Sequence, residues 1–535
     1  MISTSLLDVL VIGGGITGVS VALDAAMRGL RVGLVERDDF ASGTSSASSK
    51  MVHGGLRYIE QREFRIVYHS LLERQRMYER APHLVRRLPF LFPVRREAGP
   101  LGLRMAKGFE GLLVAYDAAG GWRIGRLHRR LGPDETLAHC PTLQPDGLRG
   151  GLLFFDTRTD DARLTLSVAR TAAHEGAMLA NHCEVSGLED YVPSRPRVVH
   201  LTVRHADGST SRRTARARVV VNATGVWSDE VNALSGGARP QRIRPAKGVH
   251  VVVPWERVRS QSGLVFPMLG GLRGRGGRGF VVRWGDYAYL GTTDTAYQGD
   301  LDDPRCERHE AELLLESLNG VLTTDLSLAD VTGTWAGLRP LIDTGKGDTA
   351  ELSREHDIVV ANGIITVAGG KLTTSRSMAE QVVDRACTLL EIRRPCRTSH
   401  SSLVGGAGFD AEAVEATGGV FAHLSGRYGT EARFVQDISA ADSAMAEPIA
   451  RGLPYIWAEA VFAVRHEMAA TVFDVLSRRI PARLLNSAAA AAAAPEVGRL
   501  LASELGVPDE EIARQVDEFL DDVEREHREL RAASD

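Results

Sequence analysis

The chain has 535 residues, of which 44% are hydrophobic and 25% are charged, so it is long enough for about three domains with a sizeable buried core. Its formal net charge of -4 argues against a protein built mainly to bind nucleic acid. Its 5 cysteines are scattered and form no CxxC pair, which argues against a disulfide framework or a zinc site and favours a reducing, cytoplasmic location.

A dinucleotide-binding unit is predicted at the start of the chain. The apolar run 7–12 suits a buried parallel strand and leads directly into residues 13–18, which satisfy the pattern G-x-G-x-x-G. A helical pattern follows over 16–29, and a second strand over 31–35 ends in Glu36. The glycines of the pattern are Gly13, Gly15 and Gly18. They permit a tight turn that a pyrophosphate can approach, and the Glu36 carboxylate can accept hydrogen bonds from ribose hydroxyls but would repel the 2′-phosphate of NADP.

Two later segments repeat the plan of an apolar strand followed by a turn of small residues. They are residues 219–227, with the sequence VVVNATGVW, and residues 364–374, with the sequence IITVAGGKLTT. Small residues in such turns let the backbone pass close to a bound dinucleotide. Three turns imply a ligand longer than one nucleotide, so FAD fits better than NAD. The predicted cofactor contacts in the two later turns are Ala223, Gly225, Gly370, Lys371, Leu372 and Thr373.

A hydroxyl-rich loop over residues 44–58 carries a basic residue, a histidine and a glycine pair, and it is able to bind phosphate or sugar oxygens. The residues that we expect at the cofactor are Thr44, Ser45 and Ser49. The loop contains TSSASSK and then HGGLRY, and in this form it resembles the FAD-dependent glycerol-3-phosphate dehydrogenases. The resemblance extends in order from residue 8 to about 385, through DDARL (160–164), NATGVW (222–227), KGVH (247–250), GTTD (291–294), GLRPL (337–341), SR (353–354) and GGKLTT (369–374).

The resemblance implies an α/β fold in three parts. These are a Rossmann-like FAD-binding domain with an amino-acid-oxidase-like layout, a substrate domain built on an antiparallel sheet, and a C-terminal α-helical domain. The strand-like runs at 250–253, 279–283 and 287–290, and the helical patterns at 457–478 and 509–531, agree with this layout. We assign residues 1–75, 150–240 and 350–395 to the discontinuous FAD-binding domain, 76–149 and 241–349 to the substrate-binding domain, and 405–535 to the helical domain.

The resemblance also implies a reaction, in which sn-glycerol 3-phosphate is oxidised at its C2 alcohol to dihydroxyacetone phosphate. Hydride passes to FAD and a base takes the hydroxyl proton. A phosphate dianion needs several cationic donors, which arginine and lysine supply. The side chains expected at the substrate are Arg57, Tyr58, Arg339, Arg354 and Lys371. Arg339 is also expected to take part in catalysis.

His53 and His250 are the candidate bases, because imidazole titrates near the working pH, and the sequence does not rank them. Asp294 in GTTD either orients a partner or caps a turn, and we favour the turn. The strand before GTTD lacks the Pro-Trp pair usual in the family, and Arg283 in this strand would change the charge near the substrate if it faced inward. The Gly- and Arg-rich residues 270–279 are interpreted as a surface loop rather than as an RNA-binding segment.

The electron acceptor that the resemblance implies is a membrane quinone, with oxygen in some relatives. Residues 88–96, with the sequence LPFLFPVRR, lead into a helical pattern over 101–113 with apolar side chains on one face. This basic, apolar element suits either the headgroup layer of a membrane or an ordinary core, and both interpretations stay open. No apolar run predicts a transmembrane helix, so we expect a cytoplasmic protein, with peripheral attachment to the inner face of the plasma membrane left open. A homo-oligomer is also left open, and no nucleic-acid partner is expected.

Three other functions compete with this interpretation. An FAD-dependent amino-acid or amine oxidase would need one arginine for a carboxylate, which would leave the set of several cations without a purpose. A non-catalytic flavin-binding protein would be favoured by loss of the cations or of both histidines, and the chain retains them. An NAD-dependent dehydrogenase is the weakest alternative, since no separate nicotinamide domain is recognisable.

Overall fold

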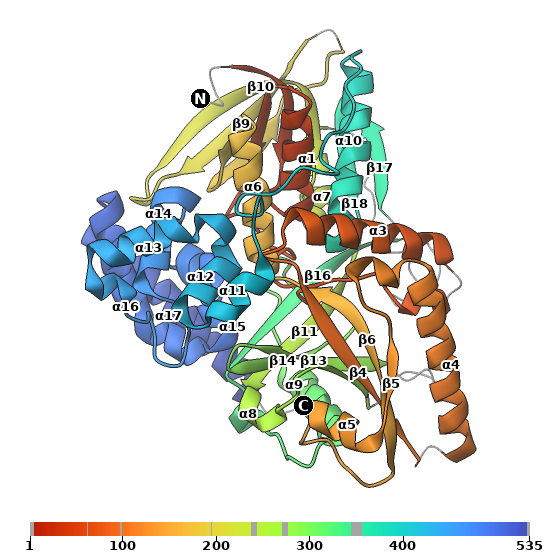
Figure 1. Ribbon diagram of the computed structural model, residues 1–535. Coiled ribbons are helices and arrows are strands. Elements are labelled where there is room, and N and C mark those ends of the chain that lie inside the picture. Colours follow the sequence, from red (N-terminus) through yellow and green to blue (C-terminus); the bar gives the residue numbers. More distant parts are fainter. Residues whose placement is uncertain are drawn as a thin grey trace.

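The computed structural model describes residues 5–60, 63–96, 99–193, 195–236, 243–269, 277–343 and 356–531, and for Arg57, Glu60, 99–106 and Glu415 it describes the backbone alone. Within these residues the chain forms two sheets and a set of C-terminal helices (Figure 1). This arrangement confirms the predicted fold class.

The first sheet has 8 strands, ordered β17-β18-β10-β1-β2-β7, with β9 paired to β10 and β8 to β9. Its strands are β1 (Leu6–Ile12), β2 (Val32–Val35), β7 (Met178–Ala180), β8 (Cys183–Leu188), β9 (Arg197–Arg204), β10 (Thr210–Asn222), β17 (Asp357–Ala361) and β18 (Ile364–Ala368). The strands β18, β10, β1, β2 and β7 run parallel. Their carboxyl ends therefore share one edge, where a nucleotide site is expected in such a sheet.

Three helices cover one face of the first sheet. They are α1 (Ile16–Met27), α6 (Asp161–His174) and α10 (Ser375–Leu389), which lie side by side in Figure 1. Apolar side chains of α1, such as Val19 and Leu23, are buried in one core with β1 and α10. The predicted order of strand, glycine turn, helix and second strand at the start of the chain is confirmed.

The second sheet has 10 strands, ordered β15-β11-β14-β13-β12-β4-β6-β3, with β16 paired to β11 and β5 to β6. Its strands are β3 (Met51–Val52), β4 (Arg86–Arg95), β5 (Arg129–Leu131), β6 (Leu148–Arg158), β11 (Ile243–Pro254), β12 (Gly263–Pro267), β13 (Arg278–Trp284), β14 (Tyr287–Gly291), β15 (Thr295–Ala296) and β16 (Gly333–Ile342). Except for the pair β12–β4, the neighbouring strands run antiparallel. The strands predicted at 250–253, 279–283 and 287–290 are part of this sheet.

The apolar run 88–96 lies almost entirely in β4, where it pairs with β6. Leu88, Phe90 and Leu91 are buried in the core of the second sheet. Of the two interpretations left open for this run, the burial of these three side chains favours the core. The helical pattern that follows forms α4 (Gly99–Ala118), whose Phe109 packs on the ring of Phe92 at 4.3 Å between centroids.

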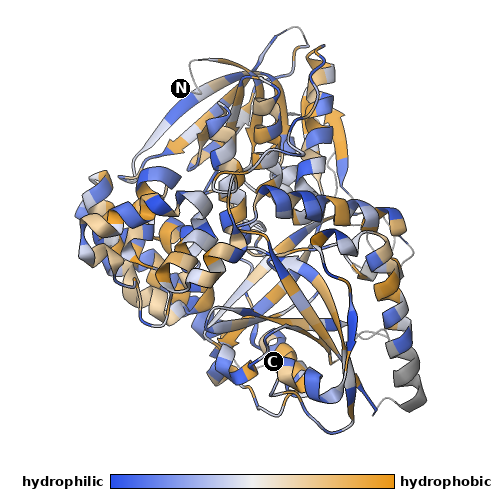
Figure 2. Ribbon diagram, in the orientation of Figure 1, coloured by the Kyte–Doolittle hydropathy of each residue, from blue (hydrophilic) through white to orange (hydrophobic). Residues whose placement is uncertain are grey.

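The C-terminal residues form a helical layer beside both sheets (Figure 1). Its helices are α11 (Ala411–Thr417), α12 (Gly419–Tyr428), α13 (Ala432–Ala441), α14 (Trp457–Glu467), α15 (Ala482–Leu485), α16 (Ser487–Leu505) and α17 (Asp509–Arg531). Figure 2 shows hydrophobic and hydrophilic residues alternating along these helices, as expected where one face is buried. The helix predicted over 457–478 is interrupted, because Met468 takes a left-handed conformation and a π-helix over Asp474–Arg479 follows.

The domain division stays a prediction, although the sheets bear on two of its borders. The border at residue 150 falls within β6, and β3 within the segment 1–75 also pairs in the second sheet. The chain therefore crosses between the first sheet and the second sheet more often than the assigned segments imply.

Candidate active site

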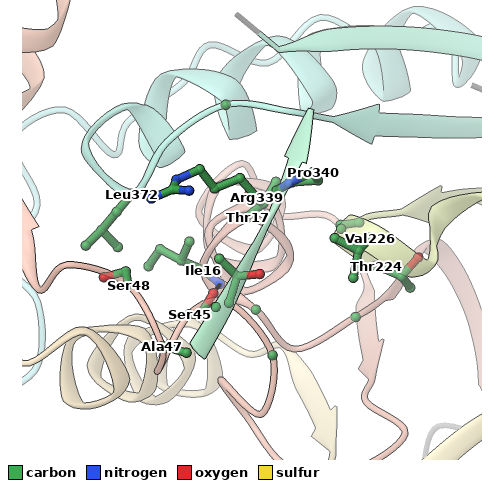
Figure 3. Close-up of a pocket in the computed structure, with 18 of the residues that line it drawn as sticks. Ile16, Thr17, Ser45, Ala47, Ser48, Thr224, Val226, Arg339, Pro340 and Leu372 are labelled. Atoms are coloured by element: carbon green, nitrogen blue, oxygen red, sulfur yellow. Dashed lines mark hydrogen bonds between the residues drawn. The ribbon is translucent and has the colours of Figure 1, made fainter. Parts of the chain in front are cut away.

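A cavity of about 790 Å³ lies where the carboxyl ends of β1, β2, β10 and β18 meet the loop after β2 and the strands β11 and β16. A cavity of this size is typical for a small ligand or cofactor. Figure 3 shows Ser45, Ala47 and Ser48 from the loop below Ile16, and Arg339 from β16 above it. The cavity thus joins the predicted nucleotide turns to the second sheet.

The first glycine turn is shaped for close approach. Gly13 has a left-handed φ of +107°, and a Cβ at this position would lie 2.7 Å from the carbonyl oxygen of Ala223. A Cβ at Gly18 would lie 2.0 Å from the carbonyl oxygen of Gly13, so α1 packs directly on the turn. Gly15 caps α1 without a side-chain bond, while Ile16 N donates to Ser45 Oγ at 2.9 Å. The start of this helix therefore meets the cavity with backbone groups, as an anion requires.

Glu36 ends β2 at the wall of the cavity. Its carboxylate accepts hydrogen bonds from Gly14 N at 2.6 Å and from Asp38 N at 2.9 Å. Burial raises the pKa of Glu36, while the backbone N–H groups of Asp38 and Gly14 oppose that shift. The two bonds hold the carboxylate at the edge where a ribose would lie.

The cofactor residues predicted from the sequence gather at this cavity, with one exception. Gly18 does not line it and instead supports the turn from within α1. The predicted residues that line the cavity are Gly13, Gly15, Glu36, Thr44, Ser45, Ser49, Ala223, Gly225, Gly370, Lys371, Leu372 and Thr373. Segments more than 300 residues apart in the sequence are thus brought to one wall.

The predicted substrate and catalytic residues, where their side chains are described, line the same cavity as the predicted cofactor residues. They are His53, Tyr58, His250, Arg339 and Lys371. The Lys371 ammonium lies 3.7 Å from the centroid of the Tyr58 ring, a cation–π contact. Arg57 begins α2 (Arg57–Glu60), although its side chain lies outside the described part, as does the whole of Arg354.

Arg339 is held in place from several sides. Its guanidinium donates to Asp294 Oδ1 at 3.1 Å, to Thr293 O at 3.3 Å and to Thr292 Oγ1 at 3.4 Å. The carboxylate of Asp294 therefore faces a partner, whereas the sequence had favoured a turn cap. Thr292 lines the cavity too, and its place in GTTD was the sequence signal that could have found it.

His250 is buried, with 2% of its surface exposed. Its Nε2 lies 3.0 Å from Ser49 Oγ, and its ring stacks on Trp335 with 4.8 Å between centroids and 12° between planes. Burial, followed by the charges of Arg339 and Lys50, lowers the pKa of His250 well below its ordinary value. The imidazole is therefore neutral at neutral pH, which is the form that can accept a proton.

Two basic residues from segments that the sequence analysis singled out do not line the cavity. Lys50, the basic residue of the hydroxyl-rich loop, does not line the cavity and is buried against Asp161. Arg283 lies with its guanidinium 3.9 Å from the centroid of the Trp255 ring, outside the cavity lining. Arg283 therefore does not face the cavity that the predicted substrate residues line.

Comparison with known proteins agrees with this geometry. A family model described as "FAD dependent oxidoreductase" matches residues 8–385. The chain belongs to the FAD dependent oxidoreductase family. A second model, described as "C-terminal domain of alpha-glycerophosphate oxidase", matches residues 396–512.

Relatives of this FAD dependent oxidoreductase cover nearly its whole length. It is 40% identical over 537 residues to "Glycerol-3-phosphate dehydrogenase 2" of Mycobacterium tuberculosis, a match that covers 98% of this chain and 89% of the relative. It is also 40% identical over 536 residues to "Glycerol-3-phosphate dehydrogenase" of Mycobacterium leprae, with the same coverage. A crystal structure of the glycerol-3-phosphate dehydrogenase from Bacillus halodurans complexed with FAD superposes with a TM-score of 0.77 at 30% identity, covering 100% of this chain and 97% of that chain.

The residues of the cavity fit FAD, the cofactor of this family. Three turns at the carboxyl ends of β1, β10 and β18 line one continuous cavity, which suits a dinucleotide better than a mononucleotide. At Gly13 the backbone leaves a hollow that any Cβ would fill. Glu36 would hold the ribose, and the start of α1 would hold the pyrophosphate.

We expect Gly13→Ala to weaken FAD binding about tenfold or more, because a left-handed backbone costs a residue with a Cβ about 1–3 kcal/mol and the new methyl group meets Ala223. Titration of the apoprotein with FAD, followed by flavin fluorescence, measures the affinity. Gly108→Ala in α4 is the matched control, since a Cβ there meets no atom within 4 Å. Equal affinities of the two variants would contradict the role of the turn.

Proposed function

We propose that the protein oxidises sn-glycerol 3-phosphate to dihydroxyacetone phosphate with FAD as the hydride acceptor, and that a quinone takes the electrons. The observation that carries the proposal is the wall of the cavity, where Arg339 and Lys371 lie with Tyr58, His53 and His250. Two cations and a phenol suit a phosphate dianion, and a neutral imidazole suits the proton of an alcohol. The names of the relatives support the same substrate.

Each residue has a stated task in this proposal. Arg339 binds phosphate oxygens through its fork of N–H groups, while Lys371 adds a point charge and Tyr58 a neutral donor. His250 takes the proton of the C2 hydroxyl, because burial and neighbouring charge keep its ring neutral. Bound FAD supplies the acceptor for the hydride from C2. His53 is the second candidate for the base, and Arg57 and Arg354 remain candidates for the phosphate.

The proposal is tested by anaerobic bleaching of the flavin. Purified yellow protein is mixed with sn-glycerol 3-phosphate without oxygen, and the visible absorbance band is followed. We expect prompt bleaching that His250→Asn slows more than His53→Asn does, and faster recovery of colour with a soluble quinone than with oxygen. Bleaching by amino acids or amines in place of this substrate would support the alternative oxidase, and bleaching by neither would support a non-catalytic flavoprotein.

We also propose that the protein contacts a membrane surface through an aromatic-basic patch, defined as Phe64, Tyr68, Trp122 and Arg123. Phe64 and Tyr68 lie one turn apart on α3 (Phe64–Arg80), and Trp122 lies on the short helix η1 (Gly121–Ile124). The three rings are 54%, 51% and 56% exposed, and the Arg123 guanidinium lies 4.9 Å from the Tyr68 ring and 5.4 Å from the Trp122 ring. Exposed aromatic and basic side chains together suit the headgroup layer. In the part of the chain that the structure describes, no helix is long and apolar enough to cross a membrane.

We expect the double variant Tyr68→Ala/Trp122→Ala to bind anionic phospholipid vesicles about tenfold more weakly, because burial of one large apolar side chain contributes about 1.5–3 kcal/mol. Co-flotation with vesicles that contain phosphatidylglycerol measures the bound fraction. Val420→Ala/Phe421→Ala is the control, since both side chains are exposed on α12, in the C-terminal layer. An equal loss in both variants, or none in either, would contradict the patch.

A further inference from the structure

The segment 46–50 of the hydroxyl-rich loop contacts strands of the second sheet next to the cavity. Trp335 Nε1 donates to the carbonyl oxygen of Ser48 at 3.1 Å, and the Tyr289 hydroxyl donates to the carbonyl oxygen of Ser49 at 3.2 Å. Ser49 Oγ also lies 3.0 Å from His250 Nε2. Two successive residues of the loop thus contact the ring of His250, the ring stacked on it and a third aromatic side chain.

A buried ion pair holds this segment from the other side. Lys50 Nζ lies 2.5 Å from Asp161 Oδ1, and the two side chains are 2% and 0% exposed. The ammonium also donates to the carbonyl oxygen of Ser46 at 2.8 Å and faces the ring of Trp335 at 5.1 Å. Lys50 itself takes a left-handed conformation with φ of 54°, so the chain turns sharply at this residue.

The hydrogen bonds of Asp161 are directed at the loop. Its Oδ2 accepts from Ser48 N at 3.0 Å and from Ser48 Oγ at 2.6 Å, and its Oδ1 accepts from Lys50 Nζ and from Ala162 N. Asp161 is the first residue of α6, so its carboxylate also lies at a helix N-terminus. Burial raises the pKa of Asp161, and the charge of Lys50 opposes the shift. The ion pair of Lys50 and Asp161 therefore holds the loop in place, and neither residue lines the cavity.

We propose that Lys50 and Asp161 are positioning residues for the reaction, holding Ser48 and Ser49 so that His250 keeps its place at the cavity and Trp335 stays stacked on its ring. The inference rests on the proposed function only for its effect on turnover. The claim that the loop holds the ring of His250 in position does not depend on which substrate is used.

The charge of Lys50 has a second effect. The charged and titratable groups that face His250 within the described residues are Arg339 from β16, Lys50 from the loop and Tyr289 from β14. Arg339 and Lys50 both lower the pKa of His250, after burial. Removing the charge of Lys50 therefore raises the pKa of His250, so the acidic limb of the rate profile moves to higher pH.

The test compares three variants of the full-length holoenzyme. Lys50→Met removes the charge at similar length, Asp161→Asn keeps the ammonium but weakens the pair, and Lys50→Arg preserves a cation. We expect Lys50→Met and Asp161→Asn to lower kcat about 10- to 100-fold with little change in KM, in line with the loss from a small misplacement of a catalytic group. Lys50→Arg should recover part of the loss. Only Lys50→Met should raise the pKa of His250.

Two readouts separate the inference from the proposed function. The His250 ring is titrated by NMR on histidine-labelled protein, with the signal assigned through His250→Gln, and turnover is measured by flavin bleaching. An unbleached wild-type flavin would refute the proposed function, while the titration would still test the loop. If Lys50→Met does not fold, Asp161→Asn decides through a fall in kcat with little change in KM.

The matched control is Arg28→Met, which breaks another buried pair, with Asp24, at the C-terminal end of α1. Unchanged kcat and an unchanged His250 titration in the folded loop variants would overturn the inference. An equal fall of kcat in Arg28→Met would overturn it as well, because the effect would then follow from lost stability alone.

Discussion

Arg339→Met is expected to raise the KM for sn-glycerol 3-phosphate about 10- to 150-fold, because a hydrogen bond to a charged group contributes about 1.5–3 kcal/mol. Arg339 lines the cavity, and its guanidinium is held by Asp294 and by backbone and hydroxyl oxygens. It is thus already oriented before a phosphate binds, which keeps the entropic cost of binding low. Steady-state rates over a range of substrate concentrations give KM and kcat.

Two comparisons make the result specific. Arg339→Lys should recover only part of the affinity, since an ammonium ion lacks the planar fork of N–H groups. Arg283→Met should leave KM unchanged, because Arg283 stacks on Trp255 outside the cavity lining. The role of Arg339 is contradicted if its loss leaves KM within twofold of the wild type, or if Arg283→Met has the same effect.

Loss of Arg339 also changes the charge at His250. Because Arg339 lowers the pKa of His250, its removal should raise that pKa and shift the acidic limb of kcat/KM to higher pH. The shift should add to the one expected for Lys50→Met, since the two cations act from different elements. The proposal for the base and the proposal for the phosphate site can therefore be examined in the same titration.

The parts of the fold that the sequence predicts well are those set by neighbouring residues. The turn at Gly13 follows from a strand, a glycine pattern and a helix that lie within 30 residues, and it has the expected form. The same holds for α17, in which apolar residues recur at helical spacing from Asp509 to Arg531. In both places the local pattern and the tertiary packing favour the same structure.

Long-range pairing accounts for what the sequence could not predict. The loop that carries Lys50 was expected to bind phosphate or sugar oxygens, but Lys50 pairs with Asp161, which is 111 residues away. Asp294 was expected to cap a turn, but Arg339 follows it by 45 residues. The run 88–96 is short and apolar up to Val94, so the spacing of its apolar residues does not separate a strand from a helix. Its pairing with β6 decides the question.

Arg479→Met is expected to lower the free energy of unfolding by about 3–5 kcal/mol, because it removes one partner of a buried ion pair and leaves a buried carboxylate short of hydrogen bonds. The Asp39 carboxylate accepts from Arg479 Nη1 at 2.5 Å, from Arg479 Nη2 at 2.9 Å and from Arg478 Nε at 2.8 Å. Arg479 lies in the C-terminal layer, whereas Asp39 follows Glu36 in the loop after β2. The pair therefore fastens the helical layer to the loop that would carry the ribose of FAD.

This position predicts a second effect besides lost stability. The variant should release FAD at a lower urea concentration than the wild type, since the loop around Glu36 is no longer fixed from the helical side. Tryptophan fluorescence reports unfolding, and free flavin fluorescence reports release. Arg465→Met is the control, because its ion pair with Glu504 at 2.7 Å is exposed and such pairs contribute only about 0–1 kcal/mol. Release of FAD together with global unfolding in both variants would show that the helical layer supports the fold but not the cofactor loop.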